Sequence, residues 1–192
     1  MKDIYFERVC EYFSNHKKWY SKRFSYSACE LWLCVEACNI LNFDHEKAFS
    51  LSEDSKYCFN EDAKRDLTIY NTLNDEVISH IEVKLLYPSY SLSKSNMKIQ
   101  EVFDKFKNKK ANEQCNLSGW FFLIWSSLNK GAYLTSENFF NDKVNQIKLM
   151  TDENENFSFD ESNYTHVLED VFKWKEGTKE IIVKAIYVKN NI

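Results

Sequence analysis

Two apolar segments joined by a short polar turn constrain the fold of this chain more than any other feature. The segments cover residues 66 to 70 and 77 to 87, and the residues between them, 71 to 75, include two asparagines and an aspartate. Asparagine and aspartate close hairpins because their side chains hydrogen-bond nearby backbone and tolerate left-handed conformations. Pro88 ends the second segment, since proline has no N–H to donate to a strand ladder. The pattern predicts a β-hairpin, with one more strand expected before it at residues 56 to 60.

Helical periodicity surrounds this hairpin. Residues 4 to 14 and 25 to 41 are expected to be helices, and residues 17 to 23 a basic, aromatic connector between them. The second of these helices has an apolar stripe near a 3.6-residue period, comprising Leu31, Cys34, Val35, Cys38 and Leu41. A later helix is expected at residues 93 to 110, with an inner face of Met97, Ile99, Val102, Phe103 and Phe106. These helices would cover the strands that lie between them in the sequence.

The order of elements predicts an α/β fold with a mixed central sheet flanked by helices. A buried strand is expected at residues 120 to 125, so residues 25 to 127 would run helix, three strands, helix, strand (αβββαβ). Residues 128 to 192 are expected to add a C-terminal helix (136 to 150), a solvated acidic loop (152 to 162) and a β-hairpin (171 to 188). A chain of 192 residues suits one domain, so we expect a single domain over residues 1 to 192.

Composition limits the classes of function. The chain has 25 basic and 29 acidic residues, and a net charge of -4 argues against tight nonspecific binding to nucleic acid, although a local basic patch suffices for contact. Its six cysteines form no Cys-x-x-Cys pair, and its four histidines lack zinc-ligand spacing, so a reducing compartment is expected and a zinc site is not. No apolar run approaches 18 residues, so we expect no membrane contact and a cytoplasmic location.

Two carboxylates and a lysine fall on the predicted hairpin. Glu82 and Lys84 share one face of the second strand because strand side chains alternate, and Asp66 opens the first strand, where pairing can bring it beside Glu82. Mg²⁺ requires only one or two carboxylates, so Asp66 and Glu82, with the Val83 carbonyl, are candidate ligands. Lys84 would orient the attacking water or help to deprotonate it. The pattern therefore favours metal-dependent cleavage of nucleic acid, and the alternative is a cross-strand salt bridge on a solvated sheet.

The same residues carry a resemblance to a known family. Asp66, then fifteen residues, then Glu82, Val83 and Lys84 resembles the motif of the PD-(D/E)xK nuclease superfamily, which has the restriction-endonuclease-like fold. The resemblance covers residues 25 to 127 and includes the αβββαβ order, although Arg65 stands where the motif has proline. It implies an endonuclease (a phosphodiesterase) that uses Mg²⁺ or Mn²⁺ held by the two acids. DNA is the favoured substrate, and RNA remains open.

The family often adds a glutamate from its first helix, and two glutamates of the predicted helix could fill that place. Glu30 lies nearer the apolar stripe than Glu36, taking 100° per residue, and therefore reaches the sheet edge more easily. Candidate contacts to substrate lie around the end of the hairpin and on the next helix: His80, Tyr87, Lys94, Lys98 and Gln100. A structural histidine and a packed tyrosine are the ordinary alternatives for His80 and Tyr87.

Other functions remain open at this point. The scaffold could serve a non-catalytic binding protein, such as a toxin immunity protein or an inhibitor, and the acidic balance suits such a protein partner. It could also be a structural α/β protein in which the three residues form a salt bridge. A nuclease of this size suits defence against foreign DNA, mobile-element functions or repair, and a homodimer that cuts both strands is compatible with it.

Overall fold

The structure is a computed structural model, described over residues 3–26, 30–43, 55–60, 65–107, 115–160, 164–175 and 177–190. The helices are α1 (Ile4–Asn15), α2 (Lys17–Tyr26), α3 (Glu30–Phe43), α4 (Leu92–Lys107) and α5 (Ser136–Asp152). The strands are β1 (Lys56–Asn60), β2 (Leu67–Asn71), β3 (Glu76–Leu86), β4 (Asn116–Ser126), β5 (Phe157–Ser158), β6 (Tyr164–Trp174) and β7 (Gly177–Asn190).

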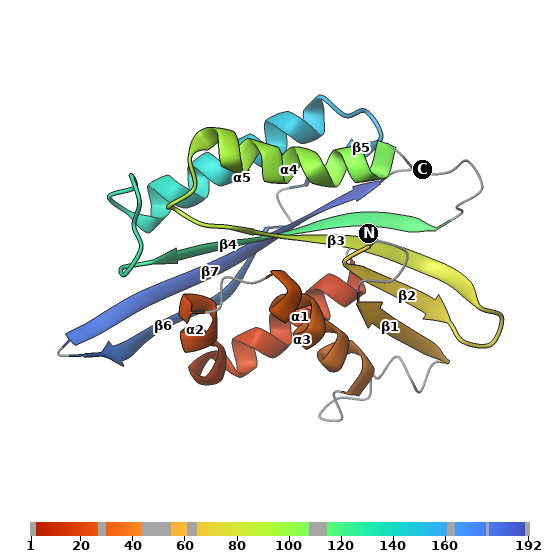
Figure 1. The fold of residues 1–192 in the computed structure, drawn as a ribbon, viewed down its shortest axis with the longest axis horizontal. Coiled ribbons are helices and arrows are strands. Elements are labelled where there is room, and N and C mark those ends of the chain that lie inside the picture. The colour runs from red at the N-terminus through yellow and green to blue at the C-terminus, as the bar shows by residue number, and fades with distance from the viewer. Residues whose placement is uncertain are drawn as a thin grey trace.

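These described strands form one mixed sheet between two layers of helices (Figure 1). The strand order is β1-β2-β3-β4-β7-β5, and β6 also pairs with β7. β3 and β4 are parallel, with α4 connecting them, whereas the other pairs are antiparallel. α1, α2 and α3 cover one face of the sheet, and α4 and α5 cover the other (Figure 1). The expected α/β fold with a mixed, helix-flanked sheet is confirmed.

The predicted hairpin is confirmed, and its turn has the expected chemistry. β2 and β3 pair antiparallel, and Asp75 in the turn has a φ of 56°, in the left-handed region that aspartate tolerates. The prediction of a connector at residues 17 to 23 is wrong, because these residues belong to α2. Tyr20 and Phe24, four residues apart, are buried at 4% and 1% exposure, so core packing holds a helix whose sequence pattern is weak.

Several predicted boundaries also differ. The helix expected from residue 25 begins at Glu30, and the strand expected at 120 to 125 extends over all of β4. The loop expected at 152 to 162 contains the end of α5 and the short strand β5, and the C-terminal hairpin is longer than residues 171 to 188. Residues 108 to 110, the predicted end of the later helix, lie outside the described residues. β4 and the strands of the C-terminal hairpin are longer than predicted because polar residues at strand ends resemble loop.

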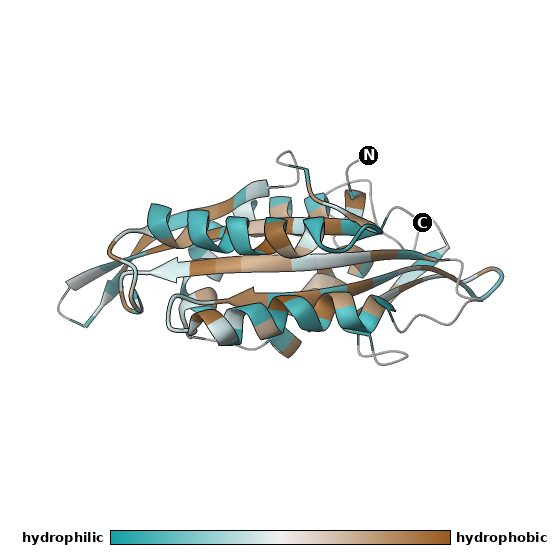
Figure 2. Cartoon of the chain, turned by 90° about the horizontal axis from the view of Figure 1, so that it is seen from above, coloured by the Kyte–Doolittle hydropathy of each residue, from teal (hydrophilic) through white to brown (hydrophobic). Residues whose placement is uncertain are grey.

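The sheet separates two hydrophobic cores. Alternate side chains of β4 point to opposite faces, so Trp120 and Phe122 pack toward α1, α2 and α3, whereas Phe121 and Leu123 pack toward α4 and α5. Figure 2 shows hydrophobic colour along the central strands and a mixture of hydrophilic and hydrophobic colour along the helices. None of the described helices has the length and apolarity required to span a membrane.

The predicted buried faces of two helices need correction. Leu31 and Val35 of α3 are 46% and 40% exposed, and the buried set is Leu33, Cys34, Ala37, Cys38, Ile40, Leu41 and Asn42. α3 contacts both α1 and the sheet, so two of its sides are buried and periodicity alone cannot orient it. On α4, Met97 is 63% exposed, although the other four residues of its predicted inner face are buried.

Candidate functional site

The site forms where β2 ceases to cover the edge of β3. In the described part of the chain, pairing between these strands ends at Ile81. Two N–H groups of β3 beyond this point donate to carboxylates: Val83 to Asp66 Oδ2 at 2.7 Å, and Leu85 to Glu30 Oε1 at 3.4 Å. The N–H and C=O of a strand residue project from the same edge, so the Val83 carbonyl faces the same opening. The gap beside β3 is thus polar, and it is entered by Asp66, which directly precedes β2, and by Glu30 of α3.

Asp66 and Glu82 converge on one cation. The Lys105 ammonium of α4 hydrogen-bonds Glu82 Oε2 and lies 3.8 Å from Asp66 Oδ1. Arg65 Nη1 adds a contact of 3.4 Å to Glu82 Oε1. Glu82 is completely buried, whereas Lys105 at the last turn of α4 is 37% exposed. The two acids therefore lie together, as the hairpin pattern predicted, with a lysine between them that can reach solvent.

Lys84 acts on these acids through its charge and also belongs to a second group of ion pairs. Its Nζ lies 3.5 Å from Glu30 Oε2 and 3.5 Å from Glu101 Oε2, and its side chain is only 7% exposed. Lys98 of α4 also hydrogen-bonds Glu30 through its ammonium. Eight charged side chains thus form what we call the charged cluster: Glu30, Asp66, Glu82 and Glu101 with Arg65, Lys84, Lys98 and Lys105.

Within the charged cluster, burial and the neighbouring negative charge shift the pKa of Glu82 most strongly. Burial raises the pKa of Glu82, the negative charge of Asp66 raises it further, and Lys105 and Arg65 oppose both effects, leaving it at about 7. A carboxyl group with this pKa holds its proton for a substantial fraction of the time near neutrality. Such a group, beside a second acid, is characteristic of functional sites more than of ordinary surfaces.

Lys84 and Glu30 are held in their charged forms. Burial opposes the charge on Lys84, but Glu30, Asp66, Glu101 and Glu82 outweigh it and raise the pKa of Lys84 above its usual value. For Glu30, burial likewise favours the neutral form, and the hydrogen bond from Lys98 with the charge of Lys84 reverses this and lowers its pKa. Lys84 therefore stays an ammonium, suited to stabilise negative charge and unsuited to accept a proton.

The oxygens around the gap suit a hard divalent cation. Asp66 and Glu82 already share one positive charge, and the Val83 carbonyl faces the same opening. Within the described ranges, no group of three or more His, Cys, Asp and Glu side chains is arranged to hold a metal. The predicted set does not need one, since Mg²⁺ is commonly bound by one or two carboxylates and keeps several waters. The residues present therefore fit the ion, provided that Lys105 moves aside.

The predicted substrate contacts divide between the cluster and its surroundings. Lys98 belongs to the charged cluster, whereas Lys94 is exposed, with its Nζ 4.2 Å from the centre of the Tyr90 ring. Gln100 donates to Asp104 Oδ1 at 2.7 Å, along the surface of α4. Of these three predicted residues, Lys98 alone is in a described ion pair with a site carboxylate.

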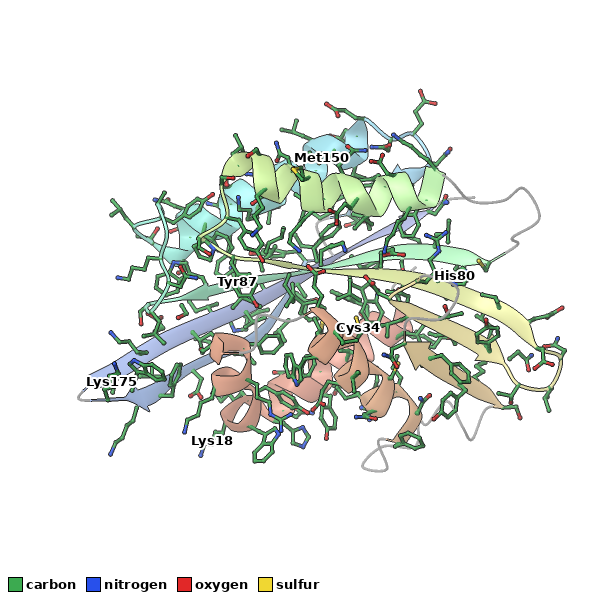
Figure 3. The ribbon with its side chains drawn as sticks, in the orientation of Figure 1. Lys18, Cys34, His80, Tyr87, Met150 and Lys175 are labelled. Carbon is green, nitrogen blue, oxygen red and sulfur yellow. The ribbon has the colours of Figure 1, made fainter. Side chains whose placement is uncertain are left out.

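His80 of β3 and Tyr87, which directly follows β3, lie toward opposite ends of α4 (Figure 3). His80 is 4% exposed, and its Nδ1 lies 3.0 Å from Thr68 Oγ1, which agrees with the structural alternative for this residue. Tyr87 is 7% exposed and packs edge-on against Tyr90, with ring centres 5.5 Å apart.

Sequence reasoning did not connect Arg65, Glu101 and Lys105 with the acids. A signal was available for α4, because Lys98, Glu101 and Lys105 are spaced by three and four residues and therefore share one face of the helix. The preference for Glu30 over Glu36 agrees with the structure, since Glu36 instead accepts from Tyr20 Oη at 2.6 Å.

Comparison of the chain with protein-family models, with curated proteins and with solved structures finds no match. The argument for function therefore depends on the geometry of the charged cluster.

Proposed function

We propose that this protein is a Mg²⁺-dependent nuclease that hydrolyses phosphodiester bonds in nucleic acid, with DNA favoured. The observation that carries the proposal is the convergence of Asp66 and Glu82 on a single cation at the open edge of β3, with Lys84 following on the same strand. The order α3, β1, β2, β3, α4, β4 supports the resemblance to the restriction-endonuclease-like fold.

Each residue has a defined task in this reaction. Asp66, Glu82 and the Val83 carbonyl would hold Mg²⁺ or Mn²⁺, which when bound acidifies a coordinated water and neutralises charge on the phosphate. Lys84, oriented by Glu30, donates hydrogen bonds to the attacking water and to the phosphate oxygen on which charge develops. The water oxygen bonds to phosphorus while the bond from phosphorus to one ester oxygen breaks. The proton of the water passes to solvent, and the released ester oxygen takes up a proton from solvent.

The raised pKa of Lys84 narrows the two roles considered for it. Because Lys84 remains an ammonium at neutral pH, it is suited to position the water and stabilise negative charge, and it is unsuited to abstract a proton. Lys98 and Arg65 add positive charge beside the acids, which suits a phosphate backbone despite the acidic balance of the whole chain.

The test is cleavage of plasmid and single-stranded DNA with Mg²⁺ or Mn²⁺, together with metal binding by calorimetry. Asp66→Asn and Glu82→Gln preserve side-chain shape and should abolish both cleavage and metal binding. Lys84→Met should reduce cleavage at least a hundredfold while metal still binds, in line with the loss of one stabilising donor. Glu169→Gln, on the distant strand β6, is the matched control and should cleave as wild type. Wild-type activity in all three site variants would refute the proposal.

A purely structural charge network is the second candidate, favoured by the position of Lys105 between the two acids. With such a network the protein would have no catalytic site, and the fold could serve a non-catalytic binding protein. The two candidates differ in the effect of neutralising Glu82. A structural network loses stability when one partner of a buried pair is removed, whereas a metal site that lacks its ion gains stability.

A further inference from the structure

A pocket of about 140 Å³ lies close to the charged cluster. It is at the carboxyl ends of the parallel strands β3 and β4, lined by Tyr87 after β3 and by Ile124 and Ser126 of β4. In open α/β sheets, ligands bind beyond the carboxyl ends of the strands. The position of the pocket is therefore one that suits a ligand.

Tyr90 belongs to both the pocket and the surroundings of the cluster. Its ring lines the pocket, and its centre lies 5.7 Å from Lys98 Nζ, which pairs with Glu30. The charges of Lys98 and Glu30 both act on the Tyr90 hydroxyl, whose pKa burial raises. A molecule bound by Lys84 and Lys98 through a phosphate would therefore have its adjoining group beside Tyr90.

The lining of the pocket suits a neutral planar ring. None of the described residues that line it carries a charge, so a phosphate finds no oppositely charged partner inside. The rings of Tyr87 and Tyr90 meet at 70°, so a flat group stacked on one presents its edge to the other. Ser89 and Asn129, joined by a hydrogen bond of 3.3 Å, add polar groups that can bond to the edge of such a ring.

The size of the pocket favours a small ring. A protein cavity of about 150 Å³ accommodates benzene, which is a single six-membered ring. A pocket of about 140 Å³ therefore suits a pyrimidine better than a two-ring purine. A base can enter only when it is unpaired, since paired bases are held in the stack of the duplex.

We infer that this pocket binds one unpaired nucleobase, preferably a pyrimidine, next to the phosphate held by the charged cluster. The inference rests on the proposed nuclease function and narrows its substrate to single-stranded or splayed nucleic acid. Aromatic stacking supplies the affinity, and it is effective with any single strand because every base has a π-face.

The test measures binding and cleavage separately. Fluorescence anisotropy in EDTA, where no cleavage occurs, compares oligo-dT, oligo-dA and duplex DNA on the wild-type protein. We expect oligo-dT to bind most tightly and duplex most weakly. Tyr90→Leu keeps an apolar side chain but removes the ring, and should weaken oligo-dT binding by about 5-fold to 100-fold, the range for loss of one stacked base. Tyr90→Phe retains the ring and should bind within about twofold of wild type.

A second measurement does not depend on a variant that folds. With the wild-type protein and Mg²⁺, a single abasic position is moved along an oligo-dT strand, and cleavage next to it is followed. Cleavage should fall at least fivefold when the abasic position lies beside the scissile phosphate. Equal cleavage at every position overturns the pocket assignment while leaving the nuclease function intact. Absence of any metal-dependent cleavage, with Tyr90→Leu still weakening binding, overturns the nuclease function and leaves the pocket assignment standing.

Discussion

Replacement of Glu82 by glutamine should make the metal-free protein more stable at alkaline pH. Glutamine has the shape of the protonated acid but never carries a charge. In the folded protein, burial and the charge of Asp66 raise the pKa of Glu82 from its usual 4.5 to about 7. Each pKa unit corresponds to about 1.4 kcal/mol, so the ionised form costs the fold about 3 kcal/mol above pH 7.

The dependence on pH follows from where protons are bound. Between pH 4.5 and 7 the folded protein holds a proton on Glu82 that the unfolded chain has released, so stability falls as pH rises through this interval. Above pH 7 the loss is complete, and below pH 4.5 it is absent. Glu82→Gln should therefore exceed wild type by about 3 kcal/mol at pH 8, and by less than about 1 kcal/mol at pH 5.

Urea unfolding in EDTA at pH 5 and pH 8, on wild type and variant, measures this difference directly. Glu101→Gln is the control, because Glu101 is 53% exposed and its ion pair with Lys84 is worth less than about 1 kcal/mol at either pH. A Glu82→Gln protein that is less stable than wild type at pH 8 would refute the reasoning. It would show that the cluster stabilises the fold and would favour the purely structural network.

Three further predictions concern the cluster and its supports. Lys105→Met should bind Mn²⁺ several-fold more tightly than wild type by calorimetry, because the ammonium that competes for both acids is gone; weaker binding would contradict that role. Asn42→Ala should cost about 2 to 4 kcal/mol in urea unfolding, since the Asn42 amide bonds both the N–H and the C=O of Cys58 at the sheet edge. Gly119→Ala should lower the free energy of unfolding by about 1 to 3 kcal/mol, because the Cβ of the new alanine would lie 2.6 Å from Val102 Cγ1 and push α4 from the sheet. An unchanged free energy of unfolding in Asn42→Ala or in Gly119→Ala would show that the structure around that residue adapts.

The hairpin and three of its site residues could be predicted because every signal for them is local. Strand alternation alone puts Glu82 and Lys84 on one face, and turn chemistry fixes the return that brings Asp66 close. The preference for Glu30 over Glu36 rests on the predicted apolar stripe of α3. That stripe is only partly buried in the structure, so it does not explain why Glu30 reaches the site. What brings Glu30 to the site is its place as the first residue of α3, beside the uncovered edge of β3.

Long-range pairing set the limit of prediction. The C-terminal hairpin was expected to be an addition to the domain, whereas β7 pairs with β4 along most of its length and contributes to both cores. Its sequence did contain a signal, since residues 181 to 188 are apolar with one exception, as in a strand buried on both faces. The sequence does not pair Lys105 with the acids because its partners, Asp66 before β2 and Glu82 of β3, are far from it along the chain.

The arrangement of charge within the cluster argues for a function beyond folding. A network that served only stability would separate its acids, or would replace buried charges by apolar side chains, which are often as stable or more so. Here two acids lie together where β3 runs on beyond the end of its pairing with β2, and one of them is buried with a pKa near 7. The lysine that balances them comes from the end of a helix, where it can withdraw into solvent. The two acids are held together at a cost in stability, and the lysine between them can move away. This arrangement suits a site that binds a divalent ion.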